Sequence, residues 1–125
     1  MSFILYVLLL MNGQTVDVGH FKPYLVNGVV RVPLRLFAEK AGATVKYESY
    51  RHQAILQFKG KTIVFPDNSE VAIVDGQRVN IGATPIKNDN SRYVPVRFLA
   101  EEMNMTVSFD AVKKSVKVQQ DLTGK

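Results

Sequence analysis

The sequence carries one motif twice, and the second copy stands 62 positions after the first. Residues 32–39, VPLRLFAE, return at residues 94–101 as VPVRFLAE. Aligned over 32–48 and 94–110, the two copies share seven of seventeen residues. A second echo precedes each copy, because NGQTVDVG at 12–19 returns as DGQRVNIG at 75–82, an offset of 63. We therefore expect a duplicated unit of about sixty residues whose two copies fold alike.

Length and composition favour one globular domain. A chain of 125 residues, 46% hydrophobic and 22% charged, resembles ordinary folded domains that bury a single core. We predict one domain over residues 1–125, made of two internal repeats at about 5–65 and 66–119. Cysteine is absent, which excludes disulfides and thiolate metal sites.

The net charge of +5 favours anionic partners. The basic residues are spread along the chain, however, and only Lys113 and Lys114 are adjacent. Aromatic and basic residues do not alternate as they do on surfaces that stack single-stranded nucleic acid. We expect no nucleic-acid partner, and a mildly basic solvated surface is the alternative to an anion site.

The apolar run at residues 3–11 resembles the core of a signal peptide. No basic residue precedes it, no small-x-small cleavage pattern follows, and it is too short to span a bilayer. Since residues 8–11 align with 71–74 in the repeat, we predict a central strand buried on both faces. The chain as written carries no export signal and reads as cytoplasmic; a removed signal peptide is the alternative.

Local patterns predict hairpin turns and short helices. Asn-Gly at 12–13 and 27–28 is the strongest short hairpin signal, and Asp75-Gly76 and Asp89-Asn90 stand at the corresponding places. Proline suits the first position of a helix, and apolar residues at i, i+3, i+4 and i+7 predict helices at 33–41 and 95–103. We predict an α+β fold of two pseudo-repeats, each made of antiparallel β-hairpins and one short α-helix packed on the sheet.

The chain contains two copies of the motif Val-Pro-(Leu/Val)-Arg-x-x-Ala-Glu, and a predicted strand that ends in an aromatic and an acidic residue follows each copy, at 47–48 and 109–110. This pattern resembles the copper amine oxidase N-terminal-like, or stalk, domain. The resemblance covers about residues 5–119. The motif Asn-Gly-x-x-x-Val-Pro-x-Arg, here residues 27–35, is fairly specific for that family. The second copy loses the Asn-Gly, and Gly42 becomes Asn104.

The resemblance implies a non-catalytic module without a cofactor, of a kind usually attached to other domains in secreted or cell-surface bacterial proteins. In the namesake oxidases such a module forms a stalk distant from the copper centre, so the resemblance implies neither copper nor oxidation. The composition agrees, because only His20 and His52 offer imidazole ligands, whereas copper sites generally draw on several imidazole or sulfur ligands.

Patterns typical of enzymes are absent from the sequence. It has no Gly-x-Ser-x-Gly motif, P-loop or dinucleotide fingerprint. Glu101 and Glu102 are adjacent, but neighbouring helix positions diverge by about 100° and do not face one site. We predict that the protein is not an enzyme; an unrecognised hydrolase is the alternative.

Arg35 and Arg97 are the main candidate binding residues. Each is expected in the first turn of its helix, where a cation opposes the positive end of the helix dipole, so its recurrence suggests a specific role. One explanation is structural, with the guanidinium tied to carbonyls of the preceding hairpin. The other is anion capture, in which Arg35 or Arg97 joins Arg31, Arg92 or Lys87 around a phosphate or carboxylate.

Tyr50 and Arg51 form a further candidate site, in a loop between two predicted strands. Exposed tyrosine rings offer stacking surfaces for sugars or bases, although tyrosines near strands more often serve packing.

These observations predict a non-catalytic, stalk-like binding or interaction module. We expect it to form a homodimer, because antiparallel sheets in a short chain leave edge strands that can pair. An anionic small molecule or a cell-envelope polymer is the expected ligand. The alternative is a stand-alone cytosolic binder that sequesters a small anionic ligand such as a nucleotide.

Overall fold

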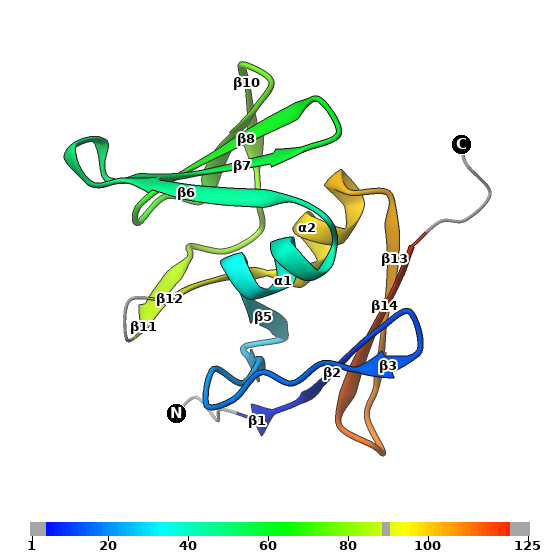
Figure 1. Cartoon of the computed structure of the whole chain (residues 1–125). Coiled ribbons are helices and arrows are strands. Elements are labelled where there is room, and N and C mark those ends of the chain that lie inside the picture. Colours follow the sequence, from blue (N-terminus) through cyan, green and yellow to red (C-terminus); the bar gives the residue numbers. More distant parts are fainter. Residues whose placement is uncertain (1–4, 89–90, 121–125) are drawn as a thin grey trace.

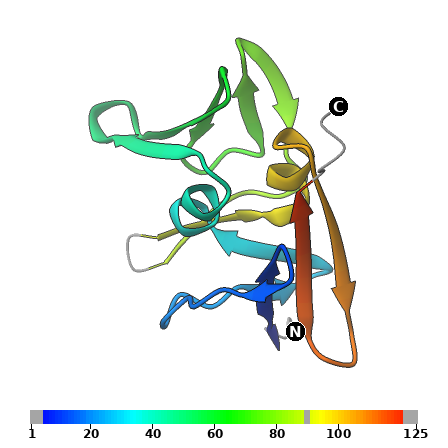
Figure 2. The same ribbon diagram turned by 45° about the vertical axis from the view of Figure 1, so that its right-hand side comes forward.

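The computed structural model describes residues 5–88 and 91–120, and this part of the chain is mostly β-structure. Strands account for 53% of it and form three sheets, accompanied by two short α-helices and one turn of 3-10 helix at Ser49–Arg51. Figures 1 and 2 show both helices in the middle of the molecule, with one sheet above them, one below and one at the side.

The first sheet lies below the helices in Figure 1 and is antiparallel throughout. Its strands in spatial order are β1 (Leu5–Tyr6), β4 (Tyr24–Val26), β5 (Val29–Pro33), β12 (Ser91–Pro95) and β11 (Ile86–Asn88). The central pair joins β5 to β12, so the sheet combines two hairpins that are distant in the sequence.

The second sheet lies above the helices and is also antiparallel. Its order is β10 (Gln77–Asn80), β9 (Val71–Val74), β8 (Lys61–Pro66), β7 (Gln53–Phe58) and β6 (Thr44–Glu48). The third sheet, at the side, has the order β13 (Met105–Asp110), β14 (Ser115–Gln120), β2 (Leu8–Met11) and β3 (Gln14–Thr15). In the third sheet β14 and β2 pair in parallel.

Each α-helix begins directly after a strand that ends in proline. Helix α1 spans Leu34–Lys40 and helix α2 spans Val96–Glu102, within the ranges predicted from the sequence. The prolines before them have extended backbones and no N–H to satisfy. Seven residues make about two turns, too few for a stable isolated helix. Packing of fully buried Phe37 and Leu99 against the sheets therefore holds both helices.

The predicted hairpin turns are confirmed where the structure describes them. Asn27 and Gly28 have φ of 51° and 77°, the left-handed pair that a tight two-residue turn requires, and they join β4 to β5. Asn12-Gly13 and Asp75-Gly76 have the same conformation. The turn predicted at residues 89–90 lies outside the described residues.

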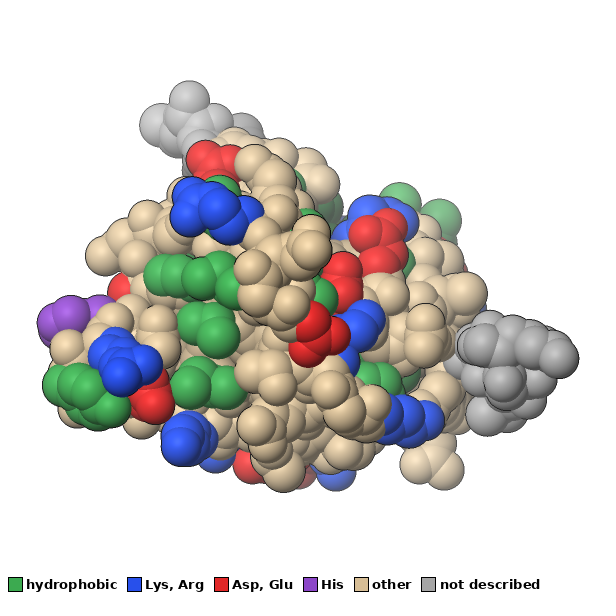
Figure 3. Space-filling model, turned by 90° about the horizontal axis from the view of Figure 1, so that it is seen from above, with side chains coloured by type: hydrophobic (Ala, Val, Ile, Leu, Met, Phe, Trp, Pro, Cys, Tyr) green, Lys and Arg blue, Asp and Glu red, His purple; other side chains and the backbone are tan. Residues whose placement is uncertain are grey.

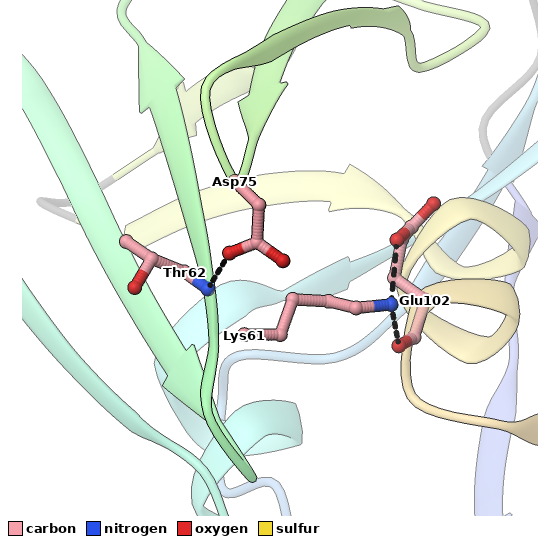
Figure 4. Close-up of polar contacts among 4 residues, drawn as sticks. All are labelled: Lys61, Thr62, Asp75 and Glu102. Atoms are coloured by element: carbon pink, nitrogen blue, oxygen red, sulfur yellow. Dashed lines mark hydrogen bonds and ion pairs between the residues drawn. The ribbon is translucent and has the colours of Figure 1, made fainter.

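The core gathers side chains from all three sheets and both helices. Its completely buried large residues include Val32, Phe37, Leu56, Ile63, Val94 and Leu99. A polar contact ties the second sheet to α2: Lys61 Nζ donates to the Glu102 carbonyl at 2.9 Å and pairs with Glu102 Oε1 at 3.0 Å (Figure 4). Nearby, Asp75 Oδ1 accepts from the Thr62 amide at 2.9 Å, which fixes the β9–β10 turn against β8.

The predicted α+β class is wrong: the described chain is β-rich, with three sheets. The two pseudo-repeats stay a prediction. The halves do not each build a sheet with its own helix. Strand β5 pairs with β12, β8 pairs with β9, and β2 pairs with β14, so segments from both halves share all three sheets. Backbone groups at the edge of one hairpin are satisfied by a strand from the other half, a long-range pairing that local patterns do not reveal.

The expectation of a strand inside a sheet at residues 8–11 is confirmed, but the expected burial on both faces is wrong. They form β2 inside the third sheet, but only alternate side chains are buried: Leu9 is 1% exposed and Leu8 is 55% exposed. One face of the third sheet therefore meets the core and the other meets solvent. Residues 3–4 of the same apolar run lie outside the described part. None of the helices described has the length and apolar character needed to cross a membrane.

Candidate functional site

A hollow of about 450 Å³ lies beside the first turn of α1, where β6 and β7 of the second sheet approach β11 and β12 of the first. We call it the basic hollow. Its polar side chains are Arg35, Tyr47, Lys87, Ser91 and Arg92. Apolar side chains complete the lining, namely Phe21, Leu34, Val45 and Ala54.

Local structure explains why three cations meet in this hollow. Lys87 and Arg92 are direct partners across the β11–β12 pair, so they project from the same face of the hairpin. Arg35 comes from the first turn of α1, which follows immediately after β5. The hollow thus brings together Arg35, Lys87 and Arg92, one of the groupings that the sequence suggested.

Arg92 is held in place by two partners. Its Nε donates to Asp67 Oδ1 at 3.0 Å, and its guanidinium carbon lies 3.7 Å from the centre of the Tyr47 ring. Tyr47 in turn donates its hydroxyl proton to Asp67 Oδ2 at 2.9 Å. Only 13% of the Arg92 side chain and 23% of the Asp67 side chain are exposed. The three groups form a closed unit that gives the wall of the hollow a fixed geometry.

The pKa values of this unit follow from the same contacts. Partial burial alone would raise the pKa of the Asp67 carboxyl, but hydrogen bonds from Arg92 and Tyr47 outweigh burial and hold that pKa below its usual value. Desolvation and the hydrogen bond to Asp67 raise the pKa of the Tyr47 phenol. Asp67 is therefore ionised and Tyr47 neutral near pH 7.

Arg35 and Lys87 are held less tightly than Arg92. Arg35 makes an i,i+4 ion pair with Glu39 at 3.6 Å, and both side chains are 58% exposed. Lys87 is exposed and makes no hydrogen bond or ion pair with another described residue, although its charge helps to lower the Asp67 pKa. These two cations can therefore reorient toward a ligand at little cost.

A second hollow, of about 440 Å³, lies beside the first turn of α2. Several residues that line it stand 62 positions from residues that line the basic hollow. Four such pairs are Arg35 and Arg97, Tyr47 and Phe109, Lys87 and Leu25, and Arg92 and Val30. The arginine of the motif is present in both, but the other cations are replaced by aliphatic residues. We call this second site the apolar hollow.

The family model described as "Copper amine oxidase N-terminal domain" matches residues 10–118. The chain belongs to this family. The N-terminal domain of copper amine oxidases is a non-catalytic domain, which agrees with the resemblance seen in the sequence. No curated protein matches the chain.

The family's name refers to a copper enzyme, but the described residues of this N-terminal domain do not fit a copper site. Among them, no three His, Cys, Asp or Glu side chains converge closely enough to hold a metal ion. His20 lies against the Phe21 ring, with ring centres 4.6 Å apart. His52 ends the 3-10 turn, in a different part of the molecule.

The other candidate residues do not join the basic hollow. Arg97 lines the apolar hollow. Arg31, on the opposite face of β5 from Val32, is buried to 8% exposure near Tyr24, and its Nε has no hydrogen-bond partner among the residues that the structure describes. Tyr50 is 74% exposed in the 3-10 turn, with the Arg51 guanidinium 5.4 Å from its ring centre. The anion-site grouping is therefore limited to Arg35, Lys87 and Arg92.

Sequence reasoning missed Tyr47, Asp67 and Ser91 as members or supports of the site. The sequence did contain a pattern that could have pointed to Tyr47, because this residue is the aromatic member of the aromatic-acidic strand end in the family pattern. Asp67 lies 25 positions before Arg92, in the turn after β8, and nothing in the local sequence indicates that the two meet. Ser91 lies at the start of β12 and carried no pattern of its own.

Proposed function

We propose that the protein is a non-catalytic binding module of the stalk type and that its basic hollow receives an anionic group. The observation that carries this proposal is the convergence of Arg35, Lys87 and Arg92 on one concave surface. Two carboxylates offset part of this charge, since Glu39 pairs with Arg35 and Asp67 pairs with Arg92. Lys87 remains as the cation without an ion pair among the described residues, so the hollow keeps a net positive charge.

The shape and lining of the hollow support a particular kind of ligand. Leu34, Val45 and Ala54 supply apolar contact, while the cations and the Ser91 hydroxyl surround it. This combination suits a carboxylate or phosphate attached to a compact organic body, such as a unit of an acidic cell-envelope polymer or a nucleotide. Arg92 is fixed by Asp67 and Tyr47, so Arg35 and Lys87 are the residues that adjust to the ligand.

The experiment uses the two arginines of the repeated motif as a matched pair. Calorimetric titrations with inorganic pyrophosphate and with a polygalacturonate oligomer compare the wild-type protein with Arg35→Ala, Lys87→Ala and Arg97→Ala. Loss of one charge-assisted contact should weaken binding about tenfold or more in the first two variants. Arg97→Ala is the control, because its cation lies in the apolar hollow. Equal weakening in Arg97→Ala, or no binding of either probe, would overturn the proposal.

We also propose that the module self-associates through sheet edges. The longest edge strands described are β13 and β6, with six and five residues. Their outer backbone groups are a template for pairing with another chain. Light scattering over a hundredfold concentration range should show a rising mean mass, and a constant monomer mass at the highest concentration contradicts self-association.

A further inference from the structure

A row of five side chains crosses the outer face of the second sheet, one from each strand. The strand register places Lys46 beside Ile55, Ile55 beside Val64, Val64 beside Ile73 and Ile73 beside Arg78. The row therefore has three aliphatic residues in the middle and one cation at each end. We call it the outer row.

The outer row faces away from the helices and the core. Successive residues of a strand point to opposite faces, and the neighbours Leu56 and Ile63 are completely buried in the core. Ile55, Val64 and Ile73 are only half-buried, although nothing polar separates them. Figure 3 looks down on this sheet and shows a column of hydrophobic side chains with basic side chains at both ends. A contiguous apolar strip with charged ends is typical of an interaction surface.

We infer that the outer row docks an amphipathic α-helix of a partner protein, with an acidic residue near each end of the helix's apolar stripe. The cations at both ends call for acidic groups on the partner. Stacking of the outer row on the outer row of a second copy is disfavoured, because each end of the row carries a cation. In a parallel and in an antiparallel arrangement alike, cations of the two copies would face each other.

The face of a sheet determines the conformation of its occupant. The backbone N–H and C=O groups of the second sheet are paired within the sheet. An extended peptide lying on the face of this sheet would therefore bury its own N–H and C=O groups unpaired. A helix satisfies these groups internally and presents an apolar stripe. With strands about 4.8 Å apart, Lys46 and Arg78 stand about 19 Å apart, which corresponds to about thirteen helical residues.

This docking surface is independent of the basic hollow. The hollow is lined by Val45, Tyr47 and Ala54, which lie on the inner face of the same strands that carry the outer row. The module can therefore bind an anion on one side of the second sheet and a protein helix on the other, and failure of one function leaves the other in place.

The probe is a synthetic helical peptide with glutamates fourteen positions apart, which is about 21 Å along the helix and within about 40° of the same face, and with leucines between them on that face. A matched peptide carries lysines in place of the glutamates. Fluorescence anisotropy should show binding of the acidic peptide to the wild-type protein. Lys46→Glu/Arg78→Glu should weaken that binding about tenfold and favour the lysine peptide instead. Val64→Lys should abolish binding of both peptides, whereas Gln57→Lys, on the same face outside the row, should preserve it.

Thermal unfolding of each variant should show that the sheet remains folded, since all four positions are at least partly exposed. The inference is overturned if the charge reversal leaves the preference between the two peptides unchanged. The inference is also overturned if the wild-type protein binds anionic lipid vesicles but neither peptide. It is overturned as well if the wild-type protein is a dimer and Val64→Lys converts it into monomers. In those cases a membrane or a second copy, respectively, occupies the row.

Discussion

Replacing Arg92 by methionine tests whether the wall of the basic hollow is a fixed unit. The substitution keeps an apolar stem near the Tyr47 ring but removes the guanidinium that donates to Asp67 at 3.0 Å. Asp67→Ala removes the other partner and leaves Arg92, with 13% of its side chain exposed, without its carboxylate. Together with the double variant these changes form a double-mutant cycle.

The size of the effect follows from burial and geometry. A hydrogen bond between charged groups contributes about 1.5–3 kcal/mol when shielded, whereas exposed ion pairs contribute about 0.2–1 kcal/mol. Because Arg92 and Asp67 are mostly covered, we expect each single variant to lose about 2 kcal/mol of unfolding free energy. The double variant should lose only about 2.5 kcal/mol, which gives a coupling of about 1.5 kcal/mol.

Urea unfolding, followed by tyrosine fluorescence and circular dichroism, measures these free energies. Arg35→Met is the control, because its ion pair with Glu39 spans 3.6 Å between side chains that are 58% exposed, and it should cost less than about 0.5 kcal/mol. Additive losses in the double variant, within about 0.3 kcal/mol, would show that Arg92 and Asp67 do not act together. Arg92 would then be free to serve as a primary ligand contact.

Two further predictions concern other parts of the polar framework. Lys61→Met should lower the unfolding free energy by about 1–2 kcal/mol, because it breaks both contacts of the ammonium with Glu102 at the end of α2. The control Lys22→Met, at an exposed loop position, should change the unfolding free energy by less than about 0.5 kcal/mol. Equal losses for the two variants in urea unfolding would refute the role of the Lys61–Glu102 contact. The free energy of unfolding should also fall in acid, because folding lowers the pKa of the Asp67 carboxyl. The stabilisation that this carboxylate contributes is fully present above its pKa in the unfolded chain, about 3.9, and is lost as pH falls through its lower pKa in the folded protein. Asp67→Asn should flatten this acid limb in urea titrations between pH 6 and pH 2.5, and a limb as steep as that of the wild type contradicts the assignment.

Turns and helix starts were predictable because they depend on a few adjacent residues. Asn27-Gly28 tolerates positive φ and closes a hairpin, and Pro33 ends a strand where α1 begins. Strand partners were not predictable in the same way. The parallel pairing of β14 with β2 joins segments more than a hundred positions apart, and the fold class was wrong because such pairings turn separate hairpins into three shared sheets.

The site shows the same division between local and long-range information. Lys87 and Arg92 project together because they are partners in one hairpin, a relation that the sequence pattern suggests. The support from Asp67 and Tyr47 requires β12 to approach the second sheet, which only the packing of the two sheets produces. Arg31 was misleading because it lies on the same strand as core residues but faces the opposite side of the first sheet.

The most direct test of the proposed function is a side-chain NMR titration. Spectra of the Arg Nε–H and Lys Nζ groups, recorded while inorganic pyrophosphate is added, report which cations meet the anion. We expect saturable shifts at Arg35 and Lys87, a smaller shift at Arg92, and none at Arg97. Shifts of similar size at Arg97 and at the adjacent pair Lys113 and Lys114 would mean that the anion only screens the surface charge, and the basic hollow would then have no binding role.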